Sequence, residues 1–394
     1  MMLLKLAWRD LRRRPVQHML TILMAGAAIA LSVAVMLAAA STEKGMTEAA
    51  MPFDMIVGAK GSPTQLIFNT IFLQDSSTGN IPGSIRQQLE EDERVKRVIP
   101  FAMGDTCQGY RVIGSDSSLF TLRPSEQEPE IFQLSEGRFF ESGYEAVVGA
   151  TAAKELGISV GDRLNTSHGL THDGTEEAHE EGFVVTGILK SMNRPYDTGI
   201  FVPIEAVWEE HGNTENDVTA LMVTPKNYAG LYQLYSEINA GTEAQAVFPG
   251  VVMGEIFENL GQTEDLLNLV SWISMGIGLI GMAVSLSWSA LARMKENALM
   301  RAMGAGRSQI LTVVLVEGLM LSVFSIAAGL LAGHAAAWMI AGYMKTTQAF
   351  YSPVIFRPEE WIVSAAAAGA GLLISLIPAL KAYRTDVIKN LAAE

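Results

Sequence analysis

Four stretches of mainly apolar residues constrain this chain more than any other feature of its sequence. An α-helix needs about 20 such residues to cross the hydrocarbon core of a membrane. Spans must be helical here because lipid offers backbone groups no hydrogen-bonding partners. The sequence therefore predicts a membrane protein with four transmembrane α-helices. The predicted spans are 17–40, 266–290, 310–344 and 361–380.

The placement of lysine and arginine predicts the orientation of these spans, because cytoplasmic loops carry an excess of both residues. Basic residues concentrate at the N-terminus, in the loop 291–309 and in the tail 381–394, whereas the loop between spans three and four has two. Both termini and the 291–309 loop are therefore expected in the cytoplasm. Residues 41–265 and 345–360 are expected outside.

The N-terminal segment, residues 1–16, has apolar and basic residues on opposite sides of a helix. Leu4, Trp8 and Leu11 recur at helical spacing, and the basic residues fall on the other side. This pattern predicts an amphipathic helix along the inner membrane surface. Pro15 is expected to bend the chain into the first span.

The long segment 41–265 is strongly acidic, with 14 Lys and Arg against 35 Asp and Glu, a formal charge of −21. The whole chain carries −14, so the remainder is net basic at +7. An acidic domain disfavours nucleic acid as a partner, whereas basic ligands or divalent cations fit it better. Solubility is the alternative explanation for the charge.

The same segment alternates helix and strand signals. The charged residues 86–97 favour a helix, and 151–157 are predicted as a short helix that Gly157 caps. Residues 164–182 are predicted as a polar loop rich in His and Glu. Strands interleaved with helices predict an α+β extracytoplasmic domain, inserted between spans one and two. The β-type runs lie at 111–113, 146–148, 183–188 and 200–203.

Several catalytic motifs are missing from the sequence. It contains no G-x-x-x-x-G-K-[ST] phosphate loop, and neither HExxH, GxSxG nor a CxxC pair. The sequence therefore predicts a chain that is not itself an enzyme.

The cytoplasmic loop between spans two and three is the most specific feature. Met294, Leu299 and Met303 line one side of a short helix, and a Gly-Ala-Gly turn leads from it into span three. Such a helix suits docking into a groove of a partner. An ordinary interfacial helix is the alternative.

This loop has the form R-x-x-E-x-x-x-x-R-A-x-G-A, which closely resembles the FtsX/MacB-type permeases of ABC transporters. The tail PALKAYR, at 378–384, is similar to the closing segment of that family. In the insert, the run EGRFFESGYEAVVGATAAKELGISVGDRL and the later FVVTGIL resemble the MacB-like periplasmic core domain.

The resemblance implies a non-catalytic permease subunit of an efflux or mechanotransmission complex in a bacterial cytoplasmic membrane. It would have no cofactor of its own, because ATP and Mg²⁺ would bind a separate ABC ATPase chain. A second copy would complete a homodimer in the lipid membrane, and an outer adaptor or lipoprotein is left open. The implied ATPase-coupling residues are Arg293, Glu296, Met300, Arg301, Gly304 and Ala305.

Three alternatives stay open at this point. One is a lipoprotein-releasing permease, which takes lipidated proteins from the outer leaflet. Another is a regulator like FtsX, which controls a cell-wall hydrolase without moving a substrate. A receptor or scaffold without an ATPase is the third.

Glu317 is an intramembrane carboxyl in span three. A carboxylate facing lipid costs about 2.5–3.5 kcal/mol, so Glu317 is expected to face protein or water. It is either a polar contact that moves during coupling or a packed, hydrogen-bonded group.

The polar loop holds His168, His172 and His179 among several carboxylates. Imidazoles with carboxylates suit Zn²⁺, Cu²⁺ or Ni²⁺. The spacing matches no closed structural zinc site, so weak Zn²⁺ binding is one expectation and a solvated charged loop is the other.

Overall fold

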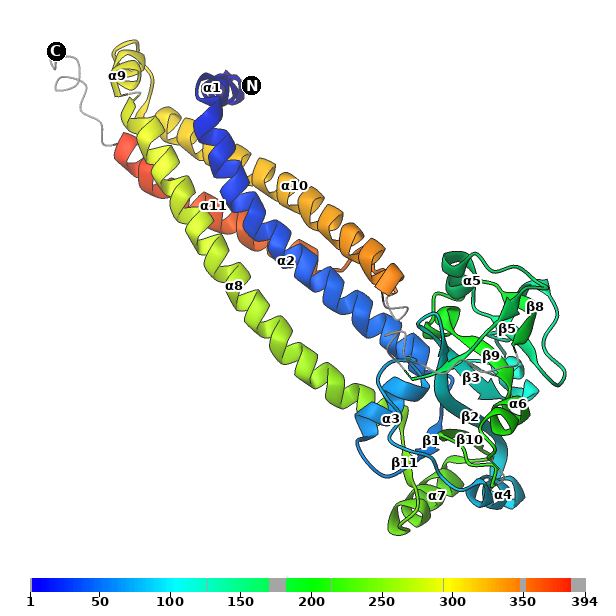
Figure 1. The fold of residues 1–394 in the computed structure, drawn as a ribbon. Helices are drawn as coiled ribbons and strands as arrows, with labels where there is room; N and C mark the ends of the chain where they lie inside the picture. Colours follow the sequence, from blue (N-terminus) through cyan, green and yellow to red (C-terminus); the bar gives the residue numbers. More distant parts are fainter. Residues whose placement is uncertain are drawn as a thin grey trace. The chain divides into compact units, whose positions relative to one another are not determined.

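The computed structural model describes residues 2–125, 127–169, 182–213, 215–292, 294–347 and 352–383. Two compact units make up the chain (Figure 1). The helical unit comprises Met1–Ser41, Leu260–Tyr343 and Pro353–Glu394, and the inserted domain comprises Thr42–Asn259 with Met344–Ser352.

Among the described residues, four helices are long and apolar enough to cross a membrane, which confirms the predicted fold class. They are α2 (Pro15–Ala50), α8 (Pro249–Ala292), α10 (Arg307–Thr347) and α11 (Glu359–Tyr383). Two shorter helices, α1 (Met2–Arg13) and α9 (Met294–Ala302), accompany them in the helical unit.

Helices α2 and α8 extend beyond the predicted spans, which end at residue 40 and begin at residue 266. Helix α2 continues to Ala50, and α8 already begins at Pro249. The predicted limits marked where the apolar run stops, but a helix continues through polar residues that favour it. Residues 41–50 contain two Ala and two Glu, and residues 249–265 contain three Glu, which are residues that favour a helix; proline at the first helical position is also compatible with one.

Glycines bring α10 close to α2. A Cβ added to Gly329 would lie 2.6 Å from the Cβ of Ile29 and 2.8 Å from the backbone oxygen of Gly26. One turn further on, a Cβ on Gly333 would lie 2.8 Å from the Cβ of Val33. These small residues therefore serve packing within one chain, where close backbone approach maximises van der Waals contact.

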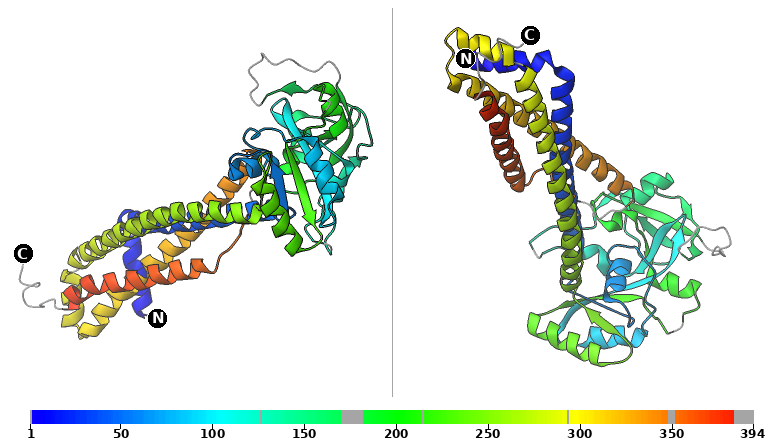
Figure 2. Two further views of the ribbon diagram at one scale, coloured as in Figure 1. Left: turned by 90° about the horizontal axis from the view of Figure 1, so that it is seen from below. Right: turned by 90° about the vertical axis from the view of Figure 1, so that its left-hand side faces the viewer.

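Helix α1 is separate from α2, because the helix ends at Arg13 and a new one begins at Pro15. Figure 2 shows α1 turned away from the axis of α2. Among its described side chains, Ala7 and Leu11 are buried, and Leu11 shares a buried cluster with Met282 and Leu321 of the bundle.

The inserted domain is built on one mixed sheet, with strand order β11-β1-β10-β2-β3-β9-β5-β8-β4; in addition β6 pairs with β8, and β7 with β2. Most pairs are antiparallel, but β3 with β9 and β5 with β8 are parallel. The strands are β1 (Met55–Gly58), β2 (Val95–Cys107), β3 (Tyr110–Ser115), β4 (Leu134–Gly137), β5 (Glu145–Val148), β6 (Arg163–Leu164), β7 (Ser167–His168), β8 (Phe183–Leu189), β9 (Ile200–Pro203), β10 (Ala220–Pro225) and β11 (Gln245–Val247).

Both faces of this sheet are buried under other elements. Successive strand residues point to opposite faces, so each strand contributes to both cores. In β9, Ile200 and Val202 join one core cluster, while Phe201 joins the other. Residues of α4, α5, α6 and α7 cover the first face, and α3 with the ends of α2 and α8 covers the second. The covering helices of the domain are α3 (Pro63–Thr70), α4 (Gly83–Glu91), α5 (Ala150–Leu156), α6 (Ile204–Glu210) and α7 (Tyr228–Ala240).

All four predicted β-type runs fall on strands, namely β3, β5, β8 and β9. The predicted short helix is α5, and Gly157 caps it with φ +67°. Two expectations need correction. The helix expected over 86–97 ends at Glu91, since β2 begins at Val95, and the start of the expected loop 164–182 contains β7.

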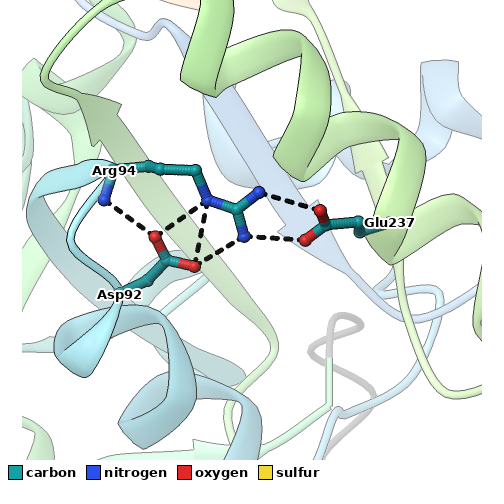
Figure 3. A network of polar contacts seen from close by, with 3 residues as sticks. All are labelled: Asp92, Arg94 and Glu237. Carbon is teal, nitrogen blue, oxygen red and sulfur yellow. Dashed lines mark hydrogen bonds and ion pairs between the residues drawn. The ribbon is translucent and has the colours of Figure 1, made fainter.

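Arg94, directly before β2, forms ion pairs with Asp92 and with Glu237 of α7 (Figure 3). Both terminal nitrogens of Arg94 donate to Glu237, at 2.8 and 2.7 Å, and Arg94 also donates to Asp92 at 2.7 Å. Hydrogen bonding to Arg94 lowers the pKa of both the Asp92 and the Glu237 carboxyl. Carboxyls with a lowered pKa contribute stability above about pH 4, which is lost as pH falls through the folded-state value.

The ion pair predicts a local effect of Arg94→Ala. In the detergent-purified full chain, amides of α7 should exchange hydrogen about two- to fivefold faster than in the wild type at neutral pH, because a partly exposed pair contributes modestly. After correction for intrinsic rates, the difference should shrink as the pH falls below about 4, because the two carboxyls become protonated. Arg123→Ala, which removes another ion pair at 2.8 Å, should leave α7 unchanged. Equal α7 exchange in Arg94→Ala and wild type would contradict the expectation.

Glycine packing predicts that Gly329→Leu destabilises the helical unit. The larger side chain must displace Ile29 or the backbone of α2, at a cost of about 1–3 kcal/mol. The matched control is Gly369→Leu in α11, since nothing among the described residues lies within 4 Å of a Cβ there. Thermal unfolding in detergent should show a lower midpoint for Gly329→Leu only. Equal midpoints for the two variants would refute the assigned packing.

Candidate functional site

Helix α9 is a short helix between α8 and α10, and its end is fixed by the chain itself. The amides of Met303 and Gly304 donate to the carbonyls of Leu299 and Arg301, each at 3.0 Å. The amide of Ala305 donates to the carbonyl of Met300 at 2.9 Å. Gly304 adopts φ +99°, which side-chain-bearing residues rarely reach, so this helix end requires a glycine.

One side of α9 and the turn after it presents apolar side chains to the surface. Leu299 is 52% exposed and Met303 79% exposed, while Ala298 is fully buried. An apolar pocket lies beside them. Its lining residues are Leu6, Met300, Met303, Ala305, Gln309, Ile310 and Val313.

Glu296 connects α9 to α1 through an ion pair with Arg13. The Arg13 Nη1 atom lies 3.0 Å from Glu296 Oε1 and 3.3 Å from Oε2. Both side chains are about half exposed, at 51% and 52%. Such a pair contributes less than about 1 kcal/mol, so it orients the two helices more than it stabilises them. Arg293 lies outside the described residues.

Glu317 is fully buried where three helices meet. Its Oε1 atom accepts a hydrogen bond from Ser289 Oγ of α8 at 3.2 Å and lies 3.7 Å from His18 Nε2 of α2. The next residue, Gly318, permits contact with α11, because a Cβ there would lie 2.5 Å from the Cβ of Ser375. The carboxyl therefore faces protein and joins polar groups of three helices.

His168 lies on strand β7 of the inserted domain. The pairing of β7 with β2 places His168 opposite Asp105 and Ser167 opposite Thr106. His211, directly after α6, reaches the same carboxylate. His172 and His179 lie outside the described residues, so their predicted part in a metal site is not described.

The Asp105 carboxylate lies between two imidazoles. Its Oδ1 atom is 3.1 Å from His168 Nδ1, and its Oδ2 atom is 2.8 Å from His211 Nε2. The hydrogen bond with Asp105 raises the pKa of His211. The Asp105 side chain is 3% exposed, whereas those of His168 and His211 are 53% and 30% exposed.

The sequence alone did not indicate Asp105 or His211, nor Arg13, His18 and Ser289 as partners. Asp105 and His211 stand 106 residues apart. The pairing of β7 with β2 brings Asp105 to His168, and the packing of α6 against β2 brings His211 there. The partners of Glu296 and Glu317 lie on other helices, and their positions depend on how the helices pack. An isolated polar residue in an apolar span, such as His18, was the one available signal.

Four membrane-length helices, with a mixed α/β domain between the first two and a short helix between the second and third, define an integral membrane protein of the permease class. The MacB-like periplasmic core domain matches residues 18–240, and the FtsX-like permease C-terminal domain matches residues 268–387. The chain belongs to the family of MacB-like and FtsX-like ABC transporter permeases.

Two curated relatives resemble parts of the chain. An uncharacterised ABC transporter permease of Methanocaldococcus jannaschii is 27% identical over 215 residues, 51% of either chain. The macrolide export ATP-binding/permease protein MacB of Hyphomonas neptunium is 30% identical over 143 residues, 36% of this chain and 21% of that protein. The chain therefore spans about half the length of the first relative and about a fifth of the second.

Two solved structures are similar to the inserted domain. The extracellular domain of YknZ, a transporter from Gram-positive bacteria, has 14% identity and a TM-score of 0.32, covering 49% of this chain and 98% of that domain. The periplasmic region of MacB from Actinobacillus actinomycetemcomitans has 11% identity and a TM-score of 0.37, covering 54% and 97%. At these scores the likeness carries nothing further about the site.

Proposed function

We propose that this chain is the non-catalytic membrane subunit of an ABC-type efflux or mechanotransmission complex. A separate ATPase chain binds ATP and Mg²⁺ and docks on α9, and its cycle moves the inserted domain. Membership of the permease family supports an ATPase partner. The proposal that the ATPase docks here is supported by the exposed apolar surface of α9 and the turn after it.

The α9 surface suits a protein partner for a physical reason. Leu299 and Met303 are large apolar side chains that stay exposed beside an apolar pocket. Exposed apolar patches of this kind mark interaction sites, and a short amphipathic helix fits into a groove of a partner. Methionine adapts to such a groove because its unbranched side chain is flexible.

Helix α1 is proposed to support the docking helix. The ion pair between Arg13 and Glu296 fixes the orientation of α9, and Leu6 lines the pocket next to it. The proposed role of Glu296 is therefore to hold α9 against α1 through Arg13. Met300, Met303 and Ala305 are proposed to contact the ATPase. Gly304 is needed for the turn and not for contact.

The proposed topology places α1, α9 and both termini in the cytoplasm and the inserted domain outside, in a bacterial cytoplasmic membrane. The placement of lysine and arginine supports this, since they concentrate at the N-terminus, in the loop 291–309 and in the tail 381–394, whereas the loop 345–360 has two. A second copy of the chain is proposed to complete the transmembrane unit, and an adaptor or lipoprotein is a candidate partner of the inserted domain.

The docking proposal is tested by co-purification from native membranes in mild detergent, with mass spectrometry and an ATPase assay. Wild type should retain an ABC ATPase. Met303→Asp should retain at least about tenfold less, because an unpaired carboxylate in an apolar contact costs more than about 1.4 kcal/mol. The matched control is Ile355→Asp, which places the same charge on another exposed apolar residue, in the loop before α11, and should retain the ATPase.

A Glu317→Gln variant in the same assay separates binding from coupling. It should co-purify the ATPase as wild type does but reduce ATP turnover in the complex, since the proposed role of Glu317 is a polar contact that changes during the cycle. Unchanged turnover would assign Glu317 to packing alone. Undiminished ATPase recovery with Met303→Asp would refute the docking surface, and no ATPase with wild type in several detergents would refute the permease function.

A further inference from the structure

We propose that Asp105, His168 and His211 form a binding site for a divalent metal ion of the zinc class in the inserted domain. The three donors come from β2, from β7 and from the residue after α6. One ligand atom of each lies within 4.8 Å of the other two. This site is additional to the proposed transport role and does not depend on it.

The geometry fits zinc with small adjustments. Zinc bonds of about 2.0–2.2 Å in a tetrahedral site place ligand atoms about 3.4 Å apart. The distances from Asp105 to the two imidazole nitrogens, 3.1 and 2.8 Å, are slightly shorter, and no pair exceeds 4.8 Å. The two rings lie 4.7 Å apart between centroids at an angle of 56°. Small rotations of the imidazoles therefore suffice to admit an ion.

The positions of the donors combine a fixed ligand with accessible ones. Asp105 is nearly completely buried and lies on β2, between residues that pair with neighbouring strands. Backbone bonds hold β7 beside it, and the amide of Gly169 donates to the carbonyl of Gly104 at 3.2 Å. His168 is 53% exposed, so an ion can enter from solvent and keep a water as its fourth ligand.

The donor set selects the class of metal. Imidazole nitrogen suits Zn²⁺, Cu²⁺ and Ni²⁺, whereas Mg²⁺ and Ca²⁺ prefer oxygen ligands throughout. The formal charge of −21 on residues 41–265 favours accumulation of cations near the domain. A carboxylate that only hydrogen-bonds to two imidazoles is the competing explanation, and it predicts no metal affinity.

An ion at this position would tie the end of α6 to two strands of the sheet. Because the three ligands come from elements distant in sequence, the ion binds the folded domain and not the unfolded chain. Excess Zn²⁺ should therefore raise the thermal midpoint of the inserted domain.

The test is equilibrium dialysis of Zn²⁺ with the detergent-purified full chain, produced with a tag that contains no histidine. Wild type should bind one Zn²⁺, and His211→Ala and Asp105→Asn should each weaken binding at least about tenfold. The double variant His172→Ala/His179→Ala tests the three-histidine set predicted from the sequence. A site built from Asp105, His168 and His211 predicts that this variant keeps the Zn²⁺ affinity within about twofold.

Co²⁺ supplies a second, spectroscopic readout of the same site. Bound Co²⁺ should give visible absorption bands in wild type and in His172→Ala/His179→Ala, and the bands should be lost in His211→Ala. Metal-free His211→Ala should still unfold cooperatively, with a midpoint lowered only by the lost hydrogen bond to Asp105. Wild-type Zn²⁺ affinity in His211→Ala and Asp105→Asn, or no Zn²⁺ binding by wild type, would overturn the proposal.

Discussion

The helical unit depends on one constraint, which is that lipid offers no hydrogen-bonding partners to backbone or side-chain polar groups. Backbone groups are satisfied within α2, α8, α10 and α11, and several polar side chains pair between these helices, as Gln17 does with Ser285. Glu317 meets Ser289 and His18 in this way. Glycines at the α10 contacts allow the close approach that such pairing needs, since larger residues would separate the helices.

The inserted domain is stabilised differently, by two hydrophobic cores that cover the two faces of its sheet. Successive residues of one strand, such as Ile200 and Phe201 in β9, enter two separate cores. Helices from distant parts of the sequence must therefore pack on each face. The pairing of β7 with β2 also places Asp105 beside His168, and the packing of α6 on the sheet adds His211, so the candidate metal site depends on the tertiary fold.

Local patterns allowed much of the architecture to be predicted from the sequence. Apolar length indicated the four spans, and β-branched runs indicated β8 and β9. Strand β2 was not predicted, because Pro100, Gly104 and Asp105 interrupt its apolar residues. Its pairing with neighbouring strands stabilises it. The motif around Glu296 was recognisable, but its partner Arg13 lies 283 residues away, where no local pattern points to it.

The central claim is that a separate ATPase chain binds the surface formed by α9 and its following turn. Site-specific photo-crosslinking in cells tests it most directly, with a benzoylphenylalanine at Met303, which is 79% exposed, or at Ile355, which is 83% exposed in the loop before α11. The account predicts a covalent adduct with an ABC ATPase from position 303 and none from position 355. An ATPase adduct from position 355, or none from position 303 despite full-length incorporation, would contradict it.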